Sequence, residues 1–539
     1  VVVTMKRRKR ARDEVSSMTL ARAVACGVAI VACAAATPAT ASSTTRVFTP
    51  TDALDRPAVD DADAVRRAFA RDFTLGVGTS AYQVEGAEGG RAPSVWDAFA
   101  RAKVGSARAS EYARGIDFYR RYVDDIDMVA SSGAKEFKMS LSWARLMRED
   151  GSVNEEGFEY YKDVVREVLA RDVTPRVALF HWDAPTWLCK GNDAVTCDGA
   201  WLDKDVIVGH FERYADAVFS RLGDAVKIWT TIEDPLTLAS LGYGAGVHAP
   251  GRRSVKEKML AAHNMLIAHA RAAKLYKEKY KRQRGQISID LKAGDAEALA
   301  WFARPLVYGD YPDRMRAELG DVLPSFSEDE KAALTQSMDF FALNVGSKLK
   351  PFQLREALKS VQARYGDKEI FVTDDGVLDQ GQAMDACLND QARIEHIDGS
   401  LDALREAKEK GVNVAGYFYR AMFDDVDWVE GVSARRGLVY IDHKDDLRRY
   451  PKLSLEHYAS YMRGEMVKPN LGAAIRRQSS STADAFFVSL GDKRSGETLA
   501  LRGFITAISA VFVTAVLLRS APVVIHDDDA QRERQSLII

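Results

Sequence analysis

The strongest constraint on the fold is a regular alternation between short strand-like runs and longer runs with helical periodicity. The strand-like runs are rich in β-branched, aromatic and other apolar residues. They cover 73–78, 137–143, 175–181, 225–229, 286–289, 339–344, 369–373 and 412–418, and the helical runs cover 158–170, 210–222, 260–280, 356–365 and 401–410. Because eight strands that alternate with helices form a closed barrel, this pattern predicts an α/β fold, a (β/α)8 TIM barrel.

Two of the predicted strands end in adjacent carboxylates. The fourth leads into Glu233-Asp234, and the seventh leads into Asp374-Asp375. Taken alone, each pair is also compatible with a solvated acidic turn. In a (β/α)8 barrel, however, the carboxyl ends of the strands meet at one face, where active sites lie. The sequence therefore predicts that Asp234 and Asp374 present a pair of carboxylates to one substrate.

Polar and aromatic residues follow two further strands at the same face. The third strand leads into His181-Trp182, and Asp427-Trp428 comes after the eighth. Carboxylates bind hydroxyl groups and indole faces stack on sugar rings, so this mouth suits a carbohydrate. A satisfied core histidine and tryptophans that only pack are the alternatives for these residues taken singly.

The N-terminal segment differs from the barrel pattern. Residues 1–41 combine a basic run, an apolar stretch and a small-residue cleavage pattern, which is the layout of a secretory signal peptide. An organelle transit peptide is the alternative. Because the chain begins with Val1, Met5 or Met18 is the expected initiator.

A second apolar segment lies near the C-terminus. Residues 503–518 carry no charge, and with the residues up to 525 they predict a single transmembrane anchor, although a span usually needs ~17–25 apolar residues. A buried core helix is the alternative. The expected layout also has a linker (42–71), the barrel (72–465), a polar linker (466–502) and a short tail (526–539). It predicts a type I membrane protein of the secretory pathway with a lumenal or extracellular barrel, vacuolar, endosomal or at the cell surface; an organelle envelope is the alternative location.

Composition limits the partners and cofactors. The 75 basic and 77 acidic side chains give a net charge of −2, so no bulk field favours nucleic acid. No zinc-type Cys/His spacing occurs, and neither a metal nor an organic cofactor is expected. Cys189 and Cys197 lie eight residues apart and would close a local disulfide in an oxidising compartment, whereas Cys387 is expected to be a small buried residue. The oligomeric state is not defined by the sequence.

Several motifs carry a family resemblance. They are GTSAYQVEGA (78–87), PSVWD (93–97), SLSWAR (140–145), FHWD (180–183), GDYP (309–312), GYF (416–418) and RGLVYID (436–442). Together they resemble glycoside hydrolase family 1, the β-glucosidase-type barrels, over roughly residues 72–465. The resemblance implies a retaining β-glycosidase that acts on a β-linked glycoside with two glutamates. It places the acid/base at Asp234 and the nucleophile at Asp374.

The resemblance also assigns the surrounding positions. The residues expected to bind substrate are Gln83, His181, Glu233, Asn344, Arg420, Asp427 and Trp428, and Lys138 is expected to support the nucleophile. Four of these depart from the family pattern: Glu233 replaces Asn, Arg420 replaces the Trp that floors the sugar subsite, Asp427 replaces Glu and Lys138 replaces Arg. Since adjacent strand residues point to opposite faces, Glu233 is expected to face away from Asp234.

Both catalytic positions carry Asp, which is one methylene shorter than Glu. On an unchanged backbone each change withdraws a carboxylate by roughly 1.3 Å. The gap would widen by up to ~2.5 Å, from the ~5–5.5 Å of a retaining pair into the ~6.5–9.5 Å of an inverting pair. We therefore expect weak or mechanistically altered hydrolysis of β-glycosides. A catalytically inactive glycan-binding pseudoenzyme and glycosyl transfer to a lipid acceptor are the alternatives.

Overall fold

The fifth strand of the sheet consists of two short pieces. These pieces pair with strands at opposite ends of the strand order, and the two pairings close a barrel. In the computed structural model the strand order is β5-β4-β3-β2-β1-β10-β8-β7-β6. β5 (Gln286–Ser288) pairs with β4 at one end of this order, and β6 (Asp290–Lys292) pairs with β7 at the other. Only Ile289 separates β5 from β6 in the chain. The predicted (β/α)8 barrel is confirmed, with β5 and β6 together as its fifth strand.

The structure describes residues 73–465 except 88–89, 105, 190–198, 347–348 and 381–382. All strand pairs of the barrel are parallel, and their carboxyl ends therefore meet at one face. The other barrel strands are β1 (Thr74–Gly78), β2 (Glu136–Ser140), β3 (Thr174–Phe180), β4 (Ile228–Ile232), β7 (Phe341–Gly346), β8 (Ile370–Asp375) and β10 (Val414–Arg420).

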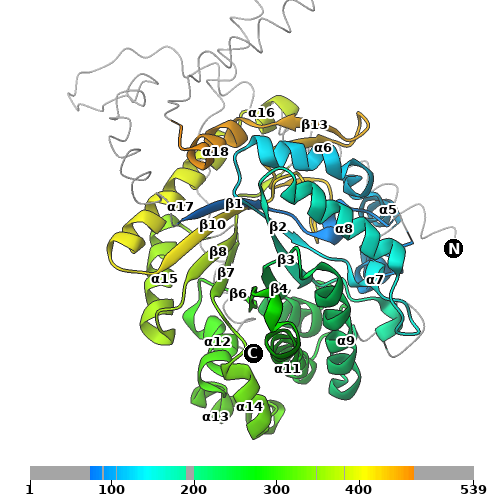
Figure 1. Cartoon of the computed structure of the whole chain (residues 1–539), viewed down its shortest axis with the longest axis vertical. Coiled ribbons are helices and arrows are strands. Elements are labelled where there is room, and N and C mark those ends of the chain that lie inside the picture. Colours follow the sequence, from blue (N-terminus) through cyan, green and yellow to red (C-terminus); the bar gives the residue numbers. More distant parts are fainter. Residues whose placement is uncertain are drawn as a thin grey trace, which may run out of the picture. The chain divides into compact units, whose positions relative to one another are not determined.

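Helices surround this ring of strands (Figure 1). They are α3 (Ala81–Val84), α4 (Val95–Phe99), α5 (Ser106–Arg114), α6 (Phe118–Ser131), α7 (Trp143–Leu146), α8 (Glu155–Leu169), α9 (Lys204–Leu222), α10 (Pro235–Thr237), α11 (Val255–Lys279), α12 (Ala296–Tyr308), α13 (Asp313–Leu319), α14 (Glu328–Thr335), α15 (Pro351–Tyr365), α16 (Met384–Leu388), α17 (Gln391–Glu409) and α18 (Leu453–Arg463). Two small antiparallel pairs join β9 (Asp379–Gln380) to β11 (Ala434–Arg435) and β12 (Val439–Asp442) to β13 (Arg448–Pro451).

The long helices pack because they present an apolar stripe to the barrel, as α8 shows. In α8 the buried residues Phe158, Tyr161, Val165 and Val168 recur at intervals of three and four, which places them on one helix face. Hydrophobic burial of that face stabilises the helix far more than its intrinsic propensity does.

The barrel contains a separate aromatic cluster around one buried cation. Phe340, Phe371 and Phe418 form this cluster, and the Arg176 guanidinium lies 4.3 Å from the centroid of the Phe371 ring. Arg176 also pairs with Glu136 at 2.8 Å. Because Glu136 is the first residue of β2, this cluster fills the amino end of the barrel and leaves the carboxyl end to other side chains.

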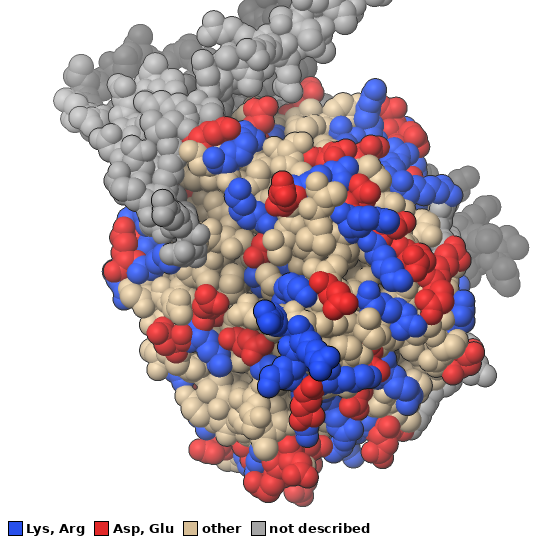
Figure 2. All heavy atoms as spheres, in the orientation of Figure 1, with Lys and Arg blue, Asp and Glu red and all other residues tan. Residues whose placement is uncertain are grey.

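Several predictions concern residues outside the described ranges. These are the signal or targeting segment (1–41), the two linkers, the transmembrane anchor (503–525) and the tail. Among the helices of the described part, none has both the length and the apolar character needed to cross a membrane. Cys189 is disulfide-bonded, while its expected partner Cys197 lies outside the described residues. Cys387 is buried, as predicted. Figure 2 shows basic and acidic side chains interspersed over the face in view, in keeping with the balanced charge.

Candidate active site

Asp234 follows the end of β4, and its carboxylate contacts the next helix. Its φ of 36° turns the chain from β4 into α10. The carboxylate accepts hydrogen bonds from the Thr237 amide at 3.0 Å and from Thr237 Oγ1 at 2.7 Å, and Lys292 Nζ lies 3.6 Å away. Burial raises the pKa of Asp234, with Lys292 and Thr237 opposing the rise. The group therefore holds a proton more readily than an exposed Asp, as a general acid requires.

Asp374 lies on β8, and its surroundings lower its pKa, whereas those of Asp234 raise it. Arg420 Nη1, from β10, donates to its Oδ2 at 3.1 Å. Burial alone would raise the pKa of Asp374, but Arg420, then Lys138 and Lys292, outweigh it and hold the pKa below its usual value. The carboxylate is therefore ionised at neutral pH, as a nucleophile or general base must be.

The expectation that Glu233 faces away from the site is wrong. Thr231 Oγ1 points outward to His269 at 2.7 Å, so strict alternation would send Glu233 outward too. Instead Glu233 Oε2 accepts a hydrogen bond from Lys138 Nζ at 2.7 Å inside the barrel. The alternation fails because β4 ends at Ile232 and Glu233 lies in the bend that follows it, where the chain is no longer an extended strand.

Lys138 holds two carboxylates, although it was expected to support the nucleophile. Its Nζ donates to Glu233, to Asp290 Oδ2 at 3.0 Å and to the Thr373 carbonyl at 3.2 Å. Burial raises the pKa of Glu233 to about 8, with Lys138 opposing the rise and Asp290 adding to it. Lys138 acts on Asp374 only through its charge and through the neighbouring carbonyl.

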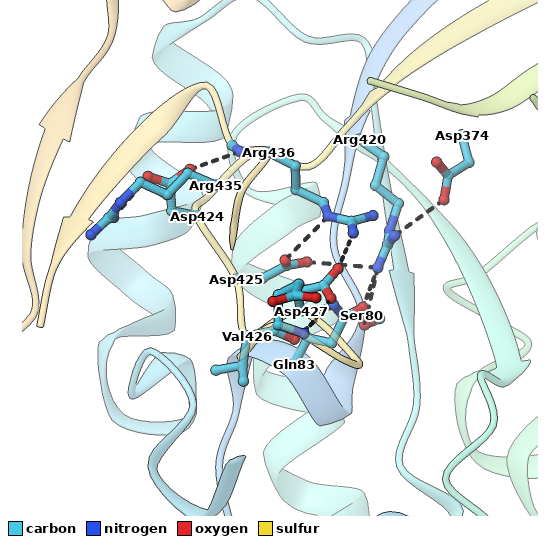
Figure 3. Close-up of polar contacts among 12 residues, drawn as sticks. Ser80, Gln83, Asp374, Arg420, Asp424, Asp425, Val426, Asp427, Arg435 and Arg436 are labelled. Atoms are coloured by element: carbon cyan, nitrogen blue, oxygen red, sulfur yellow. Dashed lines mark hydrogen bonds and ion pairs between the residues drawn. The ribbon is translucent and has the colours of Figure 1, made fainter. Parts of the chain in front are cut away.

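Both polar atoms of the Gln83 side chain contact protein groups (Figure 3). Its Nε2 donates to the Val426 carbonyl at 2.9 Å. Its Oε1 accepts from Ser80 Oγ at 2.6 Å and from Arg420 Nη2. Arg420 therefore joins Gln83 to Asp374, at the position where the family resemblance implies a Trp under the sugar.

Asp427 is engaged by a second arginine. Its Oδ2 pairs with Arg436 Nη2, and its Oδ1 accepts from two backbone amides of its own turn at 2.9 Å each. Burial alone would raise the pKa of Asp427, but Arg436 outweighs it and holds the pKa below its usual value. Asp425 lies between the two guanidinium groups, 3.6 Å from Arg420 Nη2 and 3.8 Å from Arg436 Nε.

His181 and Trp428 lie together in an aromatic cluster. Trp428 stacks on Tyr82, with ring centroids 5.4 Å apart and an interplanar angle of 6°, and its centroid is 5.5 Å from that of His181. Burial, together with Arg420, holds the pKa of His181 well below its usual value, so the imidazole is neutral. A neutral imidazole can exchange hydrogen bonds with a sugar hydroxyl.

Asn344 connects to the acid position through a lysine that the sequence reasoning missed. Lys292 Nζ donates to Asn344 Oδ1 at 2.9 Å and lies near the Asp234 carboxylate. Asp290 was also missed. The sequence did contain a signal for both residues. Asp290 and Lys292 alternate with buried Leu291 in β6, so they share the inward face of the strand. Within the described residues, no group of three or more His, Cys, Asp or Glu side chains is arranged to hold a metal ion.

Comparison with known proteins agrees with this architecture. The Glycosyl hydrolase family 1 sequence model matches residues 65–299, 293–349 and 345–466. Beta-glucosidase 4 of Oryza sativa subsp. japonica is 33% identical over 476 residues, which cover 75% of this chain and 97% of that protein. Furcatin hydrolase of Viburnum furcatum is 35% identical over 471 residues, which cover 73% and 86%.

Solved structures give the same result. A rice β-glucosidase superposes with a TM-score of 0.68 at 31% identity, covering 74% of this chain and 99% of its own. The β-glucosidase of Trichoderma harzianum has a TM-score of 0.68 at 31% identity, covering 73% and 97%. The parallel barrel, the polar groups at the carboxyl ends of its strands and these similarities together show that the chain belongs to glycosyl hydrolase family 1.

Proposed function

We propose that this chain hydrolyses β-glycosidic bonds, with Asp234 as general acid and Asp374 as nucleophile or as the base that activates water. The observation that carries the proposal is the contrast between the two carboxyl groups. Burial raises the pKa of Asp234, whereas Arg420 and Lys138 outweigh burial and lower the pKa of Asp374. Two carboxyl groups whose surroundings separate their pKa values have the character of an acid and a base.

The reaction is slow or mechanistically altered in this proposal. The carboxylate of Asp234 accepts two hydrogen bonds from Thr237, which hold it against α10. Both side chains are one methylene shorter than Glu, which on a fixed backbone widens the gap by up to ~2.5 Å toward the separation of inverting enzymes. A misplacement of about 1 Å costs on the order of a hundredfold in rate. Water fits more readily into the wider gap, which favours inversion.

Proton NMR of the first sugar released from 4-nitrophenyl β-glycosides tests the proposal. The panel contains neutral and acidic sugars, and the spectra are recorded before mutarotation. An α-anomer as first product shows inversion, and a β-anomer shows retention. Asp374→Asn should abolish release, whereas the exposed Asp445→Asn serves as the matched control and should not. Absence of any anomer above the buffer background for every sugar overturns the hydrolase proposal.

A glycan-binding protein without catalysis is the second candidate. It is favoured by the two arginines, since Arg420 engages Gln83 and Arg436 engages Asp427. Every expected substrate-binding residue is also buried. Calorimetric titration with β-linked glycans that gives affinity without turnover supports this candidate, and titrations without heat for any glycan count against it.

A further inference from the structure

Two guanidinium groups converge on one buried carboxylate in the site (Figure 3). Arg420 is the last residue of β10, and Arg436 lies between β11 and β12. The Arg420 side chain is 3% exposed, and that of Asp425 is 0% exposed. Two buried cations at one point are costly unless acceptors surround them, so the hydrogen bonds that they make indicate what the site can bind.

Two of the acceptors expected to take sugar hydroxyl groups, Gln83 Oε1 and the Asp427 carboxylate, are already used. Gln83 Oε1 accepts from Ser80 and Arg420. Asp427 accepts from two backbone amides and from Arg436. A neutral sugar brings hydroxyl donors that need acceptors, and at these two residues it must first displace a guanidinium.

Buried polar groups between the two arginines, by contrast, lack hydrogen-bond partners in the described part of the chain. Arg420 Nε and Arg436 Nε are both buried and make no hydrogen bond within the described residues, and the same holds for the two oxygens of Asp425. Asp425 faces both guanidinium groups at 3.6 and 3.8 Å, which is longer than an N–H···O hydrogen bond. Buried donors without acceptors are costly, so the two Nε positions suit a ligand group that offers acceptors.

We propose that the site accepts a β-linked glycoside of a hexuronic acid, whose carboxylate pairs with Arg420 and Arg436. This inference rests on the proposed function, because it names the substrate class of the same site. A carboxylate offers acceptor positions and no donors, and it pairs with guanidinium forks in a bidentate manner. It supplies what the two Nε donors lack.

Asp425 balances the additional negative charge by taking up a proton. It faces Arg420, Arg436, Asp427 and Asp424, and burial raises its pKa to about 6, with the arginines opposing the rise. Asp427 stays ionised because its pKa is lowered. Once protonated, Asp425 donates a hydrogen bond to the ligand carboxylate instead of repelling it.

Calorimetric titration of the full chain with phenyl 1-thio-β-D-glucuronide and phenyl 1-thio-β-D-glucoside tests this substrate class. These ligands have sulfur in place of the glycosidic oxygen and resist hydrolysis. At pH 5 the glucuronide is expected to bind at least tenfold more tightly than the glucoside. Equal affinities, or tighter binding of the glucoside, overturn the inference.

Three arginine variants locate the contact. Arg420→Gln and Arg436→Gln should each weaken glucuronide binding tenfold or more, and Arg420→Lys should keep part of the affinity because it keeps the charge. Arg435→Gln is the matched control, because Arg435 pairs with Asp424 on the other side of the loop. The assignment is overturned if Arg435→Gln loses as much glucuronide affinity, or if Arg420→Gln and Arg436→Gln lose none.

The pH dependence tests the role of Asp425. A group with a pKa of about 6 is mostly protonated at pH 5 and about one-tenth protonated at pH 7, so the glucuronide should bind about tenfold more tightly at pH 5. The glucoside should show no such change, and Asp425→Asn should abolish it. Glucuronide binding that is independent of pH in the wild type overturns the proton exchange.

Failure of this inference can be distinguished from failure of the hydrolase proposal. If the thioglucuronide binds more tightly but no 4-nitrophenyl glycoside is cleaved, the substrate class stands and hydrolysis fails. If a neutral glycoside is cleaved and the thioglucuronide shows no preference, hydrolysis stands and the substrate class fails.

Discussion

Arg420 Nη1 donates a hydrogen bond to Asp374 Oδ2 across 3.1 Å, and so the nucleophile position is supported from β10. The family resemblance places this support on β2, where Lys138 instead donates to Glu233 at 2.7 Å and to Asp290 at 3.0 Å. A positive charge still lies beside Asp374, but the side chain that provides it also fills the position of the sugar-flooring Trp. One residue therefore supplies the charge beside Asp374 and occupies the position that the family resemblance gives to the Trp.

Arg420→Gln should raise the pKa of Asp374. Burial alone raises that pKa, and the Arg420 charge is first among the groups that oppose it. If Asp374 acts in its ionised form, the acidic limb of the pH profile of kcat/KM should move to higher pH. The profile of 4-nitrophenyl β-glycoside hydrolysis measures the shift.

The control for this variant is Arg435→Gln. Arg435 pairs with Asp424 at 3.2 Å and does not contact Asp374 in the described structure. Its acidic limb should match that of the wild type. An unchanged limb in Arg420→Gln would show that Arg420 does not set the protonation of the group on which the rate depends.

Thr237→Val should move the basic limb of the same profile to higher pH. Thr237 Oγ1 donates to Asp234 at 2.7 Å and helps to lower its pKa against burial. Without that bond, Asp234 keeps its proton to higher pH and remains a competent acid. Thr230→Val is the matched control, because the Thr230 hydroxyl is buried without a hydrogen-bond partner in the described residues. A basic limb that moves equally in both variants argues against the assignment of Asp234.

The barrel was predictable from the sequence because its signal is periodic and redundant. Each strand–helix unit repeats the same apolar pattern, so an error of a few residues at one boundary does not alter the predicted number of strands. The fifth strand shows the limit, since its apolar run ends at Ile289 while pairing continues through Lys292. The pairing of residues 290–292 depends on the neighbouring strand β7, and the sequence of residues 286–289 contains no information about that neighbour.

The location of Asp234 and Asp374 at strand ends was also predictable, but their contacts were not. Asp234 and Asp374 follow from strand ends. The inward direction of Glu233 does not, because it depends on the chain bending directly after β4 ends at Ile232. Likewise, the sequence shows an arginine at 420, but its pairing with Gln83 and Asp374 requires three elements, α3, β8 and β10, to be placed together.

Lys138→Met should destabilise the fold by about 3–5 kcal/mol, because it leaves the buried carboxyl groups of Glu233 and Asp290 without their cation. Denaturation with guanidinium chloride measures the loss. The triple variant Lys138→Met, Glu233→Gln, Asp290→Asn removes the charges together and should recover most of it. If the triple variant is no more stable than the single one, uncompensated charge is not the cause.

His269→Asn should make stability less dependent on pH. His269 contacts Thr231 Oγ1 at 2.7 Å and Ser337 Oγ at 2.9 Å, and burial lowers its pKa to about 3. The unfolded chain protonates near pH 6.5 while the folded chain does not, so stability is lost as pH falls below that value.

The size of this effect follows from the two pKa values. Between pH 7 and pH 5 the wild type should lose about 2 kcal/mol through this group, and the variant should not. Urea denaturation at both pH values measures the difference between the two proteins. Equal losses in wild type and variant would mean that His269 is not the titrating group.

Asp234→Glu and Asp374→Glu together should raise the hydrolysis rate on the order of a hundredfold, because the added methylenes close a gap of up to ~2.5 Å. The single variants should gain much less, since acid and nucleophile act as a unit. In Asp374→Glu the longer side chain must also displace Arg420 from its 3.1 Å contact. Initial rates with the more tightly bound glycoside measure the gain, and the anomer released first should change from α to β.

Asp445→Glu, on an exposed turn, controls for the chemical change itself and should leave the rate unaltered. If the double variant has the same free energy of unfolding as the wild type but does not hydrolyse the glycoside faster, the length of the two carboxylate side chains does not limit the reaction. The limit would then lie with Arg420 and Arg436, whose contacts with Gln83 and Asp427 must open before a sugar can bind.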